Sequence, residues 1–124
     1  MGIDLEQAGA LPAEDAALVL SAGERARLDS HPDPDALATV LWSAKEAAFK
    51  AWSTALGGLA DVDPVEIVVV PDDAAAAFAT TGAVSSFAVQ AAGALAPRVG
   101  PIGDLHGFVH VSLFWVFSIV TGRL

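Results

Sequence analysis

Two short segments carry most of the side chains that could do chemistry. Asp4 and Glu6 alternate with apolar residues near the start of the chain, and Glu46 follows Lys45 and precedes Lys50 further along. Mg²⁺ is typically held by one or two carboxylates together with substrate phosphates. The two lysines would place positive charge beside such phosphates. The segments therefore predict a site for a divalent cation and a phosphorylated ligand, if the fold brings them together.

Each segment also has an ordinary structural explanation. Carboxylates on the exposed side of an edge strand are common. Trp42, Glu46 and Lys50 are spaced by four, so they share one face of a helix. A Glu46–Lys50 pair on a helix surface would contribute only about 0.3–0.5 kcal/mol. Taken separately, neither segment establishes a function.

The elements that must position these side chains are a strand and a long helix. Residues 1–6 alternate in polarity, so Ile3 and Leu5 should face one side and the two carboxylates the other. Asp33 is a plausible N-cap before Pro34, and the helix over 36–56 should stop at Gly57. Its apolar stripe consists of Leu37, Leu41, Ala44, Ala48 and Trp52.

The rest of the chain predicts an α+β domain. A short helix is expected over 12–19, and the S-x-x-E spacing from Ser21 to Glu24 predicts a capping box that opens a second helix. Strands near 1–6, 65–70 and 108–121 should form a small, mainly antiparallel sheet packed against the long helix. The pattern of residues 74–96 leaves helix and strand open, and 97–107, with three glycines and two prolines, predicts a loop.

Composition narrows the class of protein. The chain has 124 residues, which fits one domain, and its net charge of −9 argues against a nucleic-acid binder. It contains no cysteine, and its N-terminus is acidic, so we expect no disulfide framework, no signal peptide and a cytoplasmic location. The apolar stretch 108–120 is shorter than the roughly 20 residues that span a bilayer, so no membrane association is expected.

The two segments and their separation resemble the 4′-phosphopantetheinyl transferase family. The resemblance is carried by residues 2–6 (GIDLE) and 42–51 (WSAKEAAFKA), and 20–28 (LSAGERARL) is similar to the acidic segment between those motifs. It is specific over residues 2–52 and closest to the surfactin-synthetase-activating type. Such enzymes move the phosphopantetheine arm of coenzyme A to a serine of a carrier protein and release adenosine 3′,5′-bisphosphate.

The resemblance implies a role for individual residues. The metal ligands would be Asp4, Glu6 and Glu46, with Mg²⁺ as the expected ion. Coenzyme A phosphates would be bound by Lys45 and Lys50, and Lys50 would also act in catalysis. Glu24 falls where the family has an acidic residue implicated in deprotonating the serine.

The length of the chain suggests how it relates to the family. Surfactin-type members are about twice as long and have two similar halves, and this chain matches the second half. Short members that modify fatty-acid acyl carrier proteins have this size and assemble into trimers, so a homo-oligomer is expected. The alternatives are a non-catalytic oligomeric module that binds coenzyme A, and a truncated remnant of such an enzyme.

Overall fold

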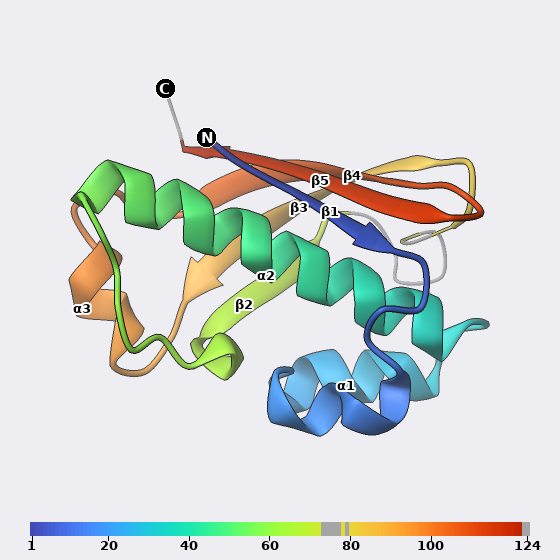
Figure 1. Cartoon of the computed structure of the whole chain (residues 1–124). Helices are drawn as coiled ribbons and strands as arrows, with labels where there is room; N and C mark the ends of the chain where they lie inside the picture. The colour runs from blue at the N-terminus through green and yellow to red at the C-terminus, as the bar shows by residue number, and fades with distance from the viewer. Residues whose placement is uncertain (73–77, 79, 123–124) are drawn as a thin grey trace.

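The computed structural model describes residues 1–72, 78 and 80–122 and confirms the predicted α+β class (Figure 1). The strands of the described part form one antiparallel sheet in the order β1-β5-β4-β3-β2. Their bounds are β1 Gly2–Gln7, β2 Ile67–Pro71, β3 Val84–Ala91, β4 Leu105–Val111 and β5 Trp115–Gly122. The first and last strands of the chain are therefore neighbours in the sheet.

The long helix α2, Pro34–Leu56, runs across one face of the sheet (Figure 1). Both predicted end signals are confirmed: Asp33 accepts a hydrogen bond from the Ala36 amide at 3.2 Å, and Gly57 takes the left-handed conformation with φ 73°. The whole predicted apolar stripe is buried in the core. No described helix, α2 included, is long and apolar enough to cross a membrane.

The segment between β1 and α2 forms two shorter helices. Residues Ala13–Leu18 form the 3₁₀ helix η1, where a short helix was predicted, and Ala22–Asp29 form α1. The predicted capping box is confirmed, because Ser21 Oγ accepts from the Glu24 amide and Glu24 Oε1 accepts from the Ser21 amide. A second 3₁₀ turn, η2 (Pro64–Glu66), leads into β2.

The described part of the second half of the chain contains more helix and strand than its composition indicates. The part of 74–96 that the structure describes contains β3, which resolves the ambiguity there in favour of a strand; residues 73–77 and 79 lie outside the described residues. The predicted loop over 97–107 was partly wrong. The helix α3 (Leu95–Val99) extends into it because Leu95 and Val99, four apart, are both buried, and β4 already begins at Leu105.

The first strand lies directly against α2 and presents its polar residues to it. Gly2 and Asp4 are buried on this side, whereas Ile3 and Leu5 are 47% and 57% exposed on the other. A Cβ on Gly2 would overlap the carbonyl oxygen of Ala47, so only glycine permits this approach. The helix is also joined to β5, since Ser43 Oγ donates to Ser118 Oγ at 2.8 Å inside the core.

Candidate metal and phosphate site

The contact between β1 and α2 brings the two predicted segments together. Lys50, on α2, donates from Nζ to the Ile3 carbonyl at 3.0 Å and to Asp4 Oδ1 at 3.1 Å. Asp4 is 95% buried, and its second oxygen, Oδ2, has no hydrogen-bond partner among the described residues. A buried carboxylate oxygen without a partner is costly, so this atom is suited to a cation that the protein does not itself supply.

Burial and nearby negative charge raise the pKa of two carboxyl groups in this cluster, Glu6 and Glu46. The pKa of Glu6 is raised to about 7 by partial burial and by the charges of Asp4 and Glu46. The pKa of Glu46 is also raised, by burial and then by Asp4. Lys50 opposes both shifts without cancelling them. Three carboxylates therefore share one region with a single lysine to balance them, and a divalent cation would relieve their repulsion.

These carboxylates fit Mg²⁺ as a donor set, although they do not form a closed cage. As the side chains lie, no three of the described His, Cys, Asp or Glu residues enclose a position for a metal ion. Mg²⁺ does not need such a cage, because it keeps several waters and takes oxygen atoms from substrate phosphates. Asp4 and Glu6 from the strand and Glu46 from the helix thus supply oxygen donors of the kind that Mg²⁺ takes, and their role as its ligands stays a prediction.

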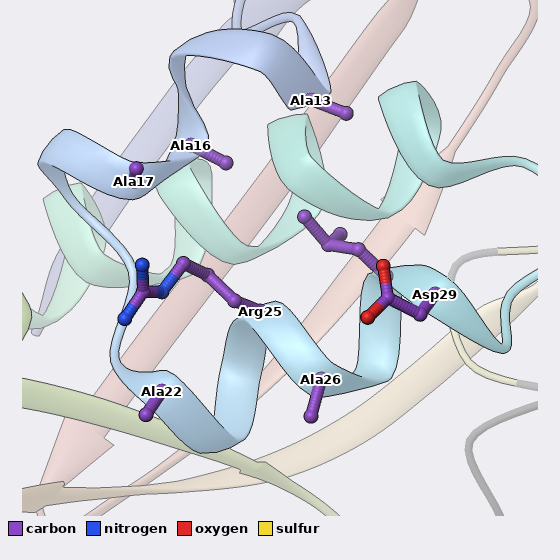
Figure 2. A pocket seen from close by; sticks show the side chains of 8 residues that line it. Ala13, Ala16, Ala17, Ala22, Arg25, Ala26 and Asp29 are labelled. Carbon is purple, nitrogen blue, oxygen red and sulfur yellow. The ribbon is translucent and has the colours of Figure 1, made fainter.

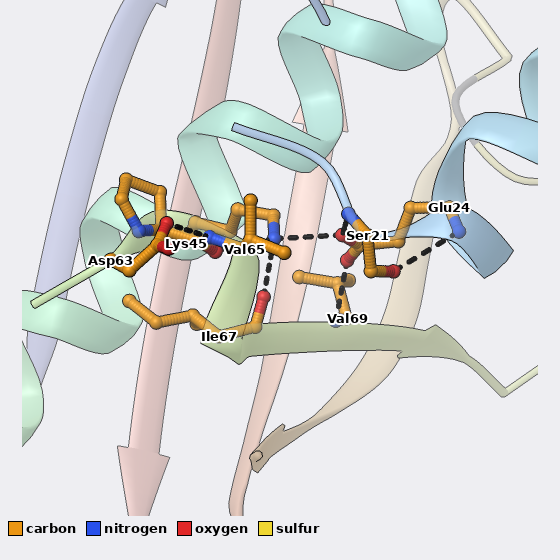
Figure 3. A network of polar contacts seen from close by, with 8 residues as sticks. Ser21, Glu24, Lys45, Asp63, Val65, Ile67 and Val69 are labelled. Atoms are coloured by element: carbon orange, nitrogen blue, oxygen red, sulfur yellow. Dashed lines mark hydrogen bonds and ion pairs between the residues drawn. The ribbon is translucent and has the colours of Figure 1, made fainter. Parts of the chain in front are cut away.

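Lys45 lies elsewhere, in a buried polar network (Figure 3). Its Nζ is 2.7 Å from Glu24 Oε1 and donates to the carbonyls of Pro64, at 2.8 Å, and Ile67. The side chains of Lys45 and Glu24 are 1% and 2% exposed. Burial lowers the pKa of Lys45, and Glu24 opposes that shift. The remaining oxygen of Glu24 accepts from the Val69 amide at 2.8 Å.

The network leaves Glu24 and Lys45 no polar atom free for a substrate in this arrangement. The roles predicted for them, a base for Glu24 and a phosphate ligand for Lys45, stay predictions that would require the pair to open. The sequence held a signal for the burial of Lys45: it follows Leu41 by four and precedes Ala48 by three, which places it on the inward stripe of α2.

A cavity of about 190 Å³ adjoins the carboxylate cluster. Glu46 contributes to both, so the cavity opens next to the predicted cation position. Its lining is mainly apolar and comes from α2 and from the segment before β2: Trp42, Lys45, Glu46, Phe49, Val62, Pro64 and Ile67. Such a lining suits an uncharged, partly apolar chain attached to a phosphate.

A second hollow, between η1 and α1, has a different character (Figure 2). It has a volume of about 400 Å³ and is walled mainly by alanine side chains, with Arg25 and Asp29 beside them. None of the predicted site residues lines it. This hollow therefore does not bring the predicted residues together, whereas the contact between β1 and α2 does.

Comparison with known proteins agrees with the motifs. The family model described as the 4′-phosphopantetheinyl transferase superfamily matches residues 1–97, which include both predicted segments and the intervening helices. None of the curated proteins compared with the chain matches it.

Proposed function

Because the chain belongs to the 4′-phosphopantetheinyl transferase superfamily, we propose that it transfers the 4′-phosphopantetheine group of coenzyme A to a serine of an acyl or peptidyl carrier protein. The observation that carries the proposal is the cluster at the contact of β1 and α2. There Asp4 Oδ2 is buried without a partner, and Glu6 and Glu46 have raised pKa values. The proposed ligands of Mg²⁺ are these three carboxylates.

In this reaction the β1–α2 cluster would stabilise the negative charge that develops on the phosphate oxygens. The serine hydroxyl gives its proton to a nearby carboxylate, directly or through water, and its oxygen forms a bond to phosphorus. The diphosphate bond breaks, and adenosine 3′,5′-bisphosphate leaves with the released charge. Bound Mg²⁺ would supply Lewis-acid stabilisation of that charge. Lys50 is suited to the same task, because its side chain is 50% exposed and can reach a phosphate while it stays close to Asp4.

The adjoining cavity is proposed to take the pantetheine arm. The arm is a chain of amide and methylene groups without charge, and the cavity offers aromatic and aliphatic walls from Trp42, Phe49 and Val62. Glu46 lies at both the cavity and the carboxylate cluster. A coenzyme A molecule could therefore place its diphosphate at the cluster and its arm in the cavity.

The activity can be tested directly. We would incubate the protein with coenzyme A, Mg²⁺ and a panel of apo carrier proteins and record the intact mass of each carrier. A gain equal to one phosphopantetheine group on a carrier supports the proposal, and a Ser→Ala carrier is the control. No gain on any carrier would defeat the catalytic claim for this chain.

A non-catalytic module that binds coenzyme A, or a truncated remnant of such an enzyme, is the second candidate. It is favoured by one observation: Glu24 and Lys45 are bound to each other and to the backbone. Calorimetry with coenzyme A and Mg²⁺ separates the candidates, because binding without transfer to any carrier favours the module and no binding favours the remnant.

We further propose that residues 1–124 act as one domain, equivalent to one half of a surfactin-type enzyme. Holo-acyl-carrier-protein synthase activity, a cytoplasmic location and a homo-oligomeric state belong to the same proposal. Neither a nucleic acid nor a membrane is expected as a partner, in keeping with the net charge of −9.

A further inference from the structure

A hydrogen bond between two serine side chains joins α2 to the sheet inside the core. Ser43 Oγ on α2 donates to Ser118 Oγ on β5 at 2.8 Å, and both residues are fully buried. The neighbours of Ser118 on this face of β5 are Val116 and Val120, which are buried as well. A buried pair of hydroxyl groups stabilises a fold little more than apolar side chains of similar shape would. A serine in this valine row therefore needs an explanation besides stability.

The strand register places this bond beside the carboxylate cluster. Ser118 is directly opposite Asp4 in the pairing of β5 with β1, and both side chains are buried on the α2 side. The Cβ atoms of directly opposed residues are only about 4.5–5.5 Å apart. In the described sheet β1 has no neighbour besides β5, so the place of Asp4 in the sheet depends on β5 (Figure 1).

On the helix, the bond lies on the face that carries the other site residues. Glu46 and Lys50 follow Ser43 by three and seven positions, so the three side chains project from one side of α2. The contact of Lys50 with Asp4 is partly exposed to solvent, and such surface pairs restrain their partners weakly. The bond to Ser118 is shielded from water, so it can hold this face of α2 against β5 more firmly.

Binding of a divalent cation is sensitive to the spacing between the strand and the helix. Mg²⁺ requires a nearly octahedral arrangement of oxygen atoms about 2.0–2.1 Å away. Ligands from two elements meet that requirement only if the elements are held in place to within about 0.5 Å. A buried hydrogen bond restricts both the distance and the angle between its groups, which apolar contacts do not. The bond between Ser43 and Ser118 thus has the properties needed to set the separation of Asp4 from Glu46.

We propose that Ser43 and Ser118 are positioning residues: their hydrogen bond holds Asp4, through β5, at the distance from Glu46 that a divalent cation requires. The inference rests on the proposed function, since it takes both carboxylates as ligands of Mg²⁺. It extends that function to β5, which lies outside the matched residues 1–97 and supplies none of the proposed ligands. The two serines act on the affinity for the ion only through the carboxylates.

The deciding variant removes both hydroxyl groups, Ser43→Ala together with Ser118→Ala. No hydroxyl of the pair is then left buried without a partner, so the melting temperature of the metal-free protein should change little. Calorimetric titration with Mg²⁺ alone should nevertheless show an affinity about tenfold lower than that of the unmodified protein. Thr39→Val is the matched control. It removes another fully buried hydroxyl of α2, one bonded to the Leu11 backbone, and should keep the Mg²⁺ affinity.

A second pair of variants covers the case in which the double variant does not fold. Ser118→Thr keeps the hydroxyl, and Ser118→Val has a methyl group of similar size in its place. Ser118→Val alone should therefore lose Mg²⁺ affinity, again about tenfold. Equal affinities in this pair, or an unchanged affinity in the double variant, would overturn the positioning role while the metal site stands. An unmodified protein that binds no Mg²⁺ would defeat the metal site and this inference together.

Discussion

Lys45 Nζ lies 2.7 Å from Glu24 Oε1, and the protein shields both side chains almost completely from solvent. The pair connects three elements, since Glu24 belongs to α1, Lys45 to α2, and the backbone partners Ile67 and Val69 to β2. Two residues that the motifs suggest for chemistry are thus also the ones that hold α1 and β2 against the long helix.

Removing one member of this pair should destabilise the fold strongly. Lys45→Met leaves the Glu24 charge buried, and Glu24→Gln leaves the Lys45 charge buried, so each should cost about 3–5 kcal/mol in the free energy of unfolding. The double variant should cost less than the sum, because neither charge then remains. Urea unfolding of all four proteins measures the coupling, with the exposed Asp15→Asn as control. Additive losses would mean that the pair does not interact as described.

Replacing Glu46 should remove metal binding without unfolding the protein. Glu46 is only partly buried, and α2 is held independently by its core stripe, so Glu46→Ala should keep its circular dichroism spectrum. We expect Mg²⁺ binding by calorimetry to be lost and phosphopantetheine transfer to fall to background. Glu14→Gln, on η1, removes a comparable charge away from the cluster and should change neither. Full activity in Glu46→Ala would refute its assignment as a ligand.

The metal-free protein should lose stability as the pH rises through neutrality. The pKa of Glu6 is raised from 4.5 in the unfolded chain to about 7 in the fold. Between these values the folded state binds more protons than the unfolded state, so this group's contribution to stability is complete below pH 4.5 and lost as the pH passes about 7. Thermal unfolding in a chelator from pH 5 to about pH 8 should show the decline.

The same experiment has two controls. Glu6→Gln cannot ionise, so its melting temperature should vary less over that range than that of the unmodified protein. Saturating Mg²⁺ should restore stability at the upper pH by neutralising the carboxylates. An identical pH dependence in Glu6→Gln would show that another group is responsible.

Gly2→Ala should separate β1 from α2. The added methyl would meet the carbonyl oxygen of Ala47, and overpacking of this kind costs typically about 1–3 kcal/mol. Because Asp4 is on the same strand, Mg²⁺ affinity should fall together with stability. Gly23→Ala is the control: a Cβ there meets nothing within 4 Å, and alanine favours the helix. Unchanged melting and metal affinity in Gly2→Ala would rule out the close approach.

Local signals account for what could be predicted from the sequence. The two ends of α2 were predicted correctly from Asp33, Pro34 and Gly57, because caps and left-handed turns depend on neighbouring residues only. The extent of α3 and β4 could not be derived in the same way. This part of the chain is held by three side chains that are buried in the core: Leu95, Val99 and Leu105. Their core partners are distant in sequence, and the glycines and prolines around them indicate only a loop.

For the candidate site, the sequence indicated the groups but not their partners. The spacing of Glu46 and Lys50 predicts a shared helix face. The structure places Lys50 beside Asp4, a pairing that the spacing alone does not predict. The pairing of Lys45 with Glu24 joins two helices whose relative position no local pattern specifies. The burial of Lys45 and Glu24 follows from how the two helices pack, so it could not be predicted from the sequence.

The pairing of β1 with β5 has a consequence for how the site is assembled during folding. Asp4 is opposite Ser118 in the strand register, and Ser118 in turn is hydrogen-bonded to Ser43 of α2. In the described sheet β1 has β5 as its sole neighbour, so β1 is held in the sheet by a strand that is synthesised much later than β1 itself. Contacts between such distant parts of a chain form slowly. A growing chain would complete α2 with Glu46 and Lys50 before β5 is available to hold Asp4 and Glu6 beside them, so the proposed metal site should be assembled late in folding.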